Sequence, residues 1–135
     1  MTTVSDVMTR HAVEVPAHLS AQADVPLLTG MQRQGDVLVV PEISGRKPGD
    51  PVPPEGVAVV RGEAGGNTHL LVAVGDVRWA HAASASGLVL GRLDVAPGAE
   101  AYLLHAEHGA AGIAPGSYTV KRQREQAEVA RLVAD

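Results

Sequence analysis

The sequence predicts a mainly β domain, built as a small antiparallel barrel or sandwich and ended by a short carboxy-terminal helix. From Met31 onward, short runs of apolar residues alternate with Gly, Pro and Asp at regular intervals. No apolar repeat of helical period lies between these runs, which favours strands over helices. The pairs Pro97-Gly98 and Pro115-Gly116 are strong turn signals. Strands at this spacing are typical of barrels and sandwiches.

The expected strands follow one another along the chain. Val37-Leu38-Val39-Val40 is an apolar run after the turn signal Gln34-Gly35-Asp36, and such a run suits a strand buried on both faces. The prolines of residues 44–56 predict a long exposed loop, because proline cannot donate a ladder hydrogen bond. The later expected strands cover residues 57–60, 69–74, 77–81, 87–94, 101–105 and 117–122.

The two ends of the chain depart from this pattern. Residues 1–30 have no sustained period and contain Pro16 and Pro26, so we expect an amino-terminal arm that contributes little to the core. Residues 31–135 then form a single β-rich domain that ends in a short helix. In that helix Val129, Leu132 and Val133 fall on one face. Since so short a helix is marginal alone, its apolar stripe must dock on the domain or on a neighbour.

Composition excludes several classes of protein. The net charge of -4 argues against a nucleic-acid-binding domain, which is normally basic. The absence of cysteine excludes disulfides, thiol nucleophiles and cysteine-bound zinc. The amino terminus lacks the pattern of a signal peptide, and no apolar run approaches the roughly 18 residues that a membrane span needs. We therefore expect a protein of the cytoplasm, or of a phage particle, with neither a nucleic-acid nor a membrane partner.

Four segments occur together in a fixed order. They are Arg33-Gln34-Gly35-Asp36-Val37-Leu38, Gly62-Glu63-Ala64-Gly65-Gly66-Asn67-Thr68-His69, His105-Ala106-Glu107-His108 and Tyr118-Thr119-Val120-Lys121-Arg122-Gln123-Arg124-Glu125. Over residues 31–135 this series resembles a family of small, functionally uncharacterised proteins from bacteria and phages. In that family the second segment ends in two histidines one residue apart, and the first of these positions is Asn67 here. The resemblance implies a β-rich fold and a role for the histidine segments, and it implies no activity.

Four residues form a candidate metal site. Glu63 and His69 lie at the two ends of a glycine-containing turn, whereas His105 and His108 bracket the end of the strand expected over 101–105. If these strands pair, three imidazoles and one carboxylate meet at one mouth of the barrel. Imidazole and carboxylate together suit Zn²⁺, Fe²⁺, Mn²⁺ or Ni²⁺.

The same residues are similar in part to those of cupin barrels, which hold a metal with histidines and a glutamate. The segment from His105 to Tyr118 resembles the second cupin motif. The first cupin motif has two histidines followed by a glutamate, whereas Glu63 here precedes a single histidine. The resemblance implies a cupin-like barrel as one form of the fold.

Two functions of different classes follow from these observations. The first is a non-enzymatic structural or interaction domain that forms a homo-oligomer or joins a larger assembly, with Trp79 and the terminal helix as apolar contacts. The alternative is a small barrel that binds a divalent metal through Glu63, His69, His105 and His108. A third interpretation is structural, because loop histidines are often exposed or hydrogen-bonded to backbone. No serine has the context of a catalytic nucleophile, so no reaction is predicted.

Overall fold

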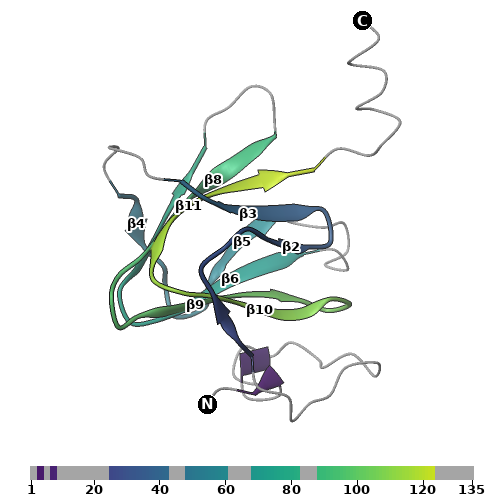
Figure 1. Cartoon of the computed structure of the whole chain (residues 1–135), viewed down its shortest axis with the longest axis horizontal. Helices are drawn as coiled ribbons and strands as arrows, with labels where there is room; N and C mark the ends of the chain where they lie inside the picture. The colour runs from purple at the N-terminus through teal and green to yellow at the C-terminus, as the bar shows by residue number, and fades with distance from the viewer. Residues whose placement is uncertain are drawn as a thin grey trace, which may run out of the picture.

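The computed structural model describes residues 3–4, 7–8, 25–42, 48–60, 68–82 and 88–123. These residues form two β-sheets packed against each other, which confirms the mainly β prediction (Figure 1). The five-stranded sheet has the order β1 (Leu27–Leu28), β10 (Gly109–Ile113), β9 (Glu100–His105), β6 (His69–Val74) and β5 (Val57–Val60). The six-stranded sheet has the order β2 (Gln32–Gln34), β3 (Val37–Pro41), β11 (Gly116–Arg122), β8 (Val89–Val95), β7 (Val77–His81) and β4 (Asp50–Pro51). Every pair of neighbours is antiparallel except β1 and β10.

The described strands make a sandwich and not a closed barrel, so the barrel alternative, including its cupin-like form, is wrong. Each sheet ends in two open edges, β1 and β5 in one and β2 and β4 in the other. Two of these edge strands, β1 and β4, have only two residues each. Pro51 in β4 has no N–H to donate, and proline is typical of strands that end a sheet. The two-residue strands β1 and β4 therefore offer little backbone on which either ladder could extend.

The main core lies between the two sheets and is built by alternation along each strand. In β3 and β7, for example, Val37, Val39, Val77 and Trp79 are buried while the residues between them are half-buried. Trp79 is therefore a core residue and not the surface anchor that the assembly hypothesis assigned to it. Its indole packs over Gly91 in β8, where an added Cβ would lie 2.4 Å from the ring. Glycine at this position makes room for the largest side chain of the core.

A second core cluster covers the outer face of the five-stranded sheet. It joins Val72, Tyr102 and Leu104 of β6 and β9 to four amino-terminal residues, Val4, Val7, Met8 and Val25. Met8 and Val7 are fully buried. The expectation that residues 1–30 contribute little to the core is therefore wrong for these side chains. Val4, Val7 and Met8 have the i, i+3, i+4 spacing of one helical face, and the N–H of Val7 donates to the carbonyl oxygen of Thr3 at 3.2 Å.

Three expected strands, residues 57–60, 69–74 and 77–81, have the predicted bounds. The strand β10 was not predicted, because its sequence Gly-Ala-Ala-Gly-Ile contains residues of low strand propensity. The expected carboxy-terminal helix, with Val129, Leu132 and Val133, lies outside the described residues. The part of the chain that the structure describes contains no helix long and apolar enough to cross a membrane.

Candidate functional site

Three histidines meet at the end of the sandwich where β6 begins and β9 ends. His69 is the first residue of β6, His105 is the last of β9, and His108 lies in the turn before β10. The ring centroids of His69 and His105 are 4.4 Å apart, and those of His105 and His108 are 4.6 Å apart. We call these residues the histidine cluster. The sequence predicted that they come together, whereas Glu63 lies outside the described residues.

The buried side chain of Gln34 reaches the cluster from the other sheet. Its Nε2 donates hydrogen bonds to the carbonyl oxygens of Leu103 and Gly109, at 2.7 and 3.1 Å. Because both partners are acceptors, the amide nitrogen must face them, and Oε1 must face the Nδ1 of His69, 2.9 Å away. His69 therefore carries a hydrogen on Nδ1. Its Nε2 is left with a lone pair when the ring is neutral.

That lone pair faces a carboxylate. The Nε2 of His69 lies 3.5 Å from Oδ1 of Asp36, in the β2–β3 turn. Burial, together with the nearby His105, lowers the pKa of His69 to about 4, so the ring is neutral at pH 7. Two acceptor atoms thus face each other beside the two buried histidines of the cluster, His69 and His105.

The other oxygen of Asp36 binds an arginine. Nε of Arg122, at the end of β11, donates to Oδ2 over 3.0 Å. Burial alone would raise the pKa of Asp36, but the Arg122 guanidinium holds that pKa below its usual value. Asp36 is therefore an anion at neutral pH. It is also partly open to solvent, with 45% of its side chain exposed.

His105 has a different bonding pattern. Its Nδ1 accepts hydrogen bonds from the backbone N–H groups of Glu107 and His108, at 3.0 and 3.2 Å. The neutral ring therefore carries its hydrogen on Nε2. Offering Nε2 to a metal would move that hydrogen to Nδ1, against two backbone donors. The arrangement suits His105 to hold the β9–β10 turn in place, and burial lowers its pKa.

Gly35 lets the backbone of the β2–β3 turn lie close to the cluster. A Cβ at this position would lie 3.0 Å from Nε2 of His108 and 3.4 Å from Cε1 of His69. The residue also has a φ of 60°, a conformation that glycine adopts without the steric cost paid by other residues. Both rings therefore lie close to Gly35, the residue before Asp36.

Within the described ranges, no group of three or more His, Asp or Glu side chains is arranged to hold a metal. His69 and Asp36 supply two donor atoms that face each other. Sequence reasoning missed Gln34 and Asp36, because it assigned both to a turn. Two signals were available: their position just before an apolar strand, and their place in the first of the four segments that carry the family resemblance.

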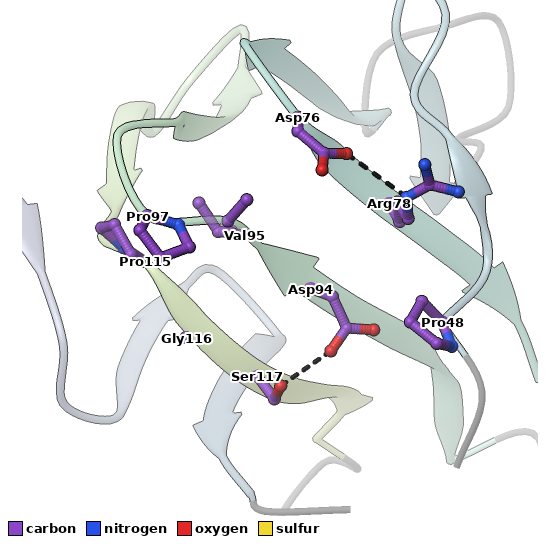
Figure 2. Close-up of a pocket in the computed structure, with 10 residues that line it drawn as sticks. Pro48, Asp76, Arg78, Asp94, Val95, Pro97, Pro115, Gly116 and Ser117 are labelled. Carbon is purple, nitrogen blue, oxygen red and sulfur yellow. Dashed lines mark hydrogen bonds and ion pairs between the residues drawn. The ribbon is translucent and has the colours of Figure 1, made fainter.

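A separate pocket of about 480 Å³ opens near the start of β11, at the opposite end of that strand from Asp36 (Figure 2). Its charged groups have partners, including Arg92, whose Nε lies 3.4 Å from Oδ2 of Asp94. Asp94 accepts a hydrogen bond from the Ser117 hydroxyl at 2.7 Å, and Asp76 pairs with Arg78 at 3.3 Å. Because these charges already have partners, the pocket is a weaker candidate site than the histidine cluster.

Comparison with models of known protein families shows which family the chain belongs to. A family model described as "Domain of unknown function (DUF8820)" matches residues 33–123. The chain belongs to this family. The match confirms membership of an uncharacterised family, and it includes Gln34, Asp36, Arg122 and the histidine cluster. Neither the search of curated proteins nor the search of solved structures gave a match.

Proposed function

We propose that this DUF8820 domain binds a divalent transition-metal ion, with Nε2 of His69 and a carboxylate oxygen of Asp36 as ligands. The proposal rests on one observation, the 3.5 Å separation of these two acceptor atoms. A hydrogen bond between them would be about 2.7–3.2 Å long and would need a hydrogen on Nε2. Two ligand atoms about 2.0–2.2 Å from one Zn²⁺ at the tetrahedral angle lie about 3.4 Å apart. The observed spacing fits a shared cation.

The surroundings of His69 support the same function. Metal-binding histidines usually donate their second ring N–H to a carbonyl or carboxylate oxygen, which fixes the tautomer and the ring orientation. Gln34 supplies that acceptor for His69. Of the ligands expected from the sequence, His108 borders Gly35 beside His69 but forms no metal-holding group of three with His69 and Asp36. Glu63 lies outside the described residues and stays a proposed further donor. We assign His105 to positioning, because its Nδ1 already accepts two backbone hydrogen bonds.

A calorimetric titration with Zn²⁺ and with Mn²⁺ tests the proposal. We expect one ion per chain, and we expect Asp36→Asn to weaken binding at least about tenfold, since losing even a supporting residue costs about that much. Asp36 is partly exposed, so this variant should fold. His81→Gln is the matched control, because His81 is exposed and pairs with Trp79 away from the cluster. Equal binding by the Asp36 variant, or none by the unmodified protein, would contradict the proposal.

Self-association is a second proposed function, in the cytoplasm or within a larger particle such as that of a phage. Three apolar side chains near the β1 edge of the five-stranded sheet support it. Leu27, Leu28 and Met31 are 38, 45 and 68% exposed. An open sheet edge with apolar side chains is a template for pairing with another copy.

We expect sedimentation at micromolar concentration to show a homo-oligomer that dissociates when Leu28 and Met31 are both changed to lysine. Lysine at an edge disfavours pairing because two copies would bring like charges together. Leu38→Lys, on the half-buried outer face of β3, is the control for adding a charge elsewhere. A monomeric unmodified protein would rule out this function and leave metal binding untouched.

A further inference from the structure

We propose that the pocket at the start of β11 binds a neutral polyol of monosaccharide size, with hydroxyl groups on neighbouring carbon atoms. The pocket has a volume of about 480 Å³, which is within the range of small-molecule sites. It lies at the opposite end of β11 from Arg122 and Asp36. The inference is therefore independent of the proposed metal function.

Three neighbouring strands place the polar groups of this pocket side by side. Arg78 of β7 is opposite Asp94 of β8, and Asp94 is opposite Ser117 of β11. Residues opposite each other on antiparallel strands project from the same face of the sheet. Asp76 precedes β7, and its Oδ1 accepts a hydrogen bond from Nε of Arg78 at 3.3 Å. Figure 2 shows the Asp76–Arg78 pair and the Asp94–Ser117 pair on two sides of the pocket.

These groups keep donors and acceptors that a ligand can use. Arg78 donates to Asp76 through Nε, and no described residue accepts a hydrogen bond from its two terminal amino groups. The Ser117 hydroxyl donates its hydrogen to Asp94 at 2.7 Å, so its oxygen is left as an acceptor. Asp76 is 61% exposed and has a second carboxylate oxygen. Because a hydroxyl group both donates and accepts, neighbouring hydroxyls on one molecule match this set of an acceptor, a donor and an acceptor.

The charges of the pocket favour a ligand without charge. Asp76 is paired with Arg78, and the negative charge of Asp94 is balanced by Arg92 at 3.4 Å. An anion would compete with Asp76 for the guanidinium of Arg78, whereas a cation would compete with Arg78 for the carboxylate of Asp76. A neutral ligand leaves both ion pairs in place.

The rest of the pocket wall suits the carbon skeleton of such a ligand. Three proline rings line it, those of Pro48, Pro97 and Pro115. Small-molecule sites commonly combine an apolar wall with a few polar groups that fix the orientation of the ligand. The C–H face of a sugar ring can pack on the prolines while its hydroxyl groups face Arg78 and Ser117.

An NMR titration of the backbone amide signals with D-glucose, in the presence of a chelator, tests the proposal. We expect millimolar glucose to shift the signals of residues that line the pocket. Arg78→Met should weaken binding about tenfold or more, because a hydrogen bond to a charged group is lost. Arg78 is 42% exposed, so this variant should fold. Arg33→Met makes the same change at an exposed arginine of β2 and should bind glucose like the unmodified protein.

Cyclohexanol, a ring of similar size with one hydroxyl group, separates hydrogen bonding from the filling of an apolar pocket. We expect it to bind much more weakly than glucose. Equal binding of the two probes, or equal glucose binding by the Arg78 variant, would overturn the polyol site. Glucose shifts that are absent, or that are spread over the surface outside the pocket, would overturn it as well. Each of these results leaves the metal site unaffected, since the titration contains no free metal.

Discussion

Changing Gln34 to leucine is expected to lower the free energy of unfolding by about 3 kcal/mol. The substitution keeps the approximate volume but removes three buried hydrogen bonds, to Leu103, Gly109 and His69. Each buried polar group that loses its partner costs about 1–3 kcal/mol. Urea unfolding followed by circular dichroism measures the loss. The same change should weaken metal binding about 10–100-fold, because His69 loses the acceptor that orients it.

Gln32→Leu is the matched control, since it makes the same change two residues away on the same strand. Gln32 is only half-buried and donates a single hydrogen bond, to the carbonyl oxygen of Gly112 at 3.0 Å. We expect a loss of about 1 kcal/mol from this variant and no change in metal binding. Similar losses from the two variants would mean that Gln34 has no special part in joining the two sheets.

Acidification should destabilise the metal-free protein by about 3 kcal/mol between pH 7 and pH 4. The pKa of His69 is about 4 in the fold, against an ordinary value near 6.5 in the unfolded chain. Between these values the unfolded state binds a proton that the folded state does not, so stability falls as the pH falls. The size of this loss in stability follows from the difference between the two pKa values, at about 1.4 kcal/mol for each pKa unit. His105, whose pKa is also lowered, acts in the same direction.

Urea midpoints at pH 7, 6, 5 and 4 in the presence of a chelator measure this slope. His69→Gln should flatten the profile, even if its stability at pH 7 is lower, because the titrating group is gone. Asp36 adds only a small loss in the same direction at the acid end of this window, because its pKa is lowered in the fold while the unfolded carboxyl begins to take up a proton as the pH nears 4. A profile as steep in the His69 variant as in the unmodified protein would show that other groups cause the acid sensitivity.

Local patterns were enough to predict much of the sheet structure. Three strands have the expected bounds, residues 57–60, 69–74 and 77–81. Short apolar or alternating runs bounded by turn residues favour a strand over a helix. The sequence predicted the meeting of His69 and His105 on the condition that their strands pair, since both lie at strand ends. Their strands are antiparallel neighbours, with Leu70 opposite Leu104.

Contacts between residues distant in sequence decided the rest. Val7 and Met8 are buried against β6 and β9 because those strands present an apolar outer face. Their i, i+3, i+4 spacing with Val4 covers a single turn, which is too short to predict burial from the sequence. Gln34 belongs to the site because its side chain reaches from β2 to His69 in the other sheet. The two residues are 35 positions apart in the sequence, so no local pattern links them. The sequence by itself determined which residue types gather at this end of the sandwich. Only the tertiary structure decided which ring nitrogen carries a hydrogen and which faces Asp36, because a tautomer depends on the hydrogen-bond partners that the fold provides.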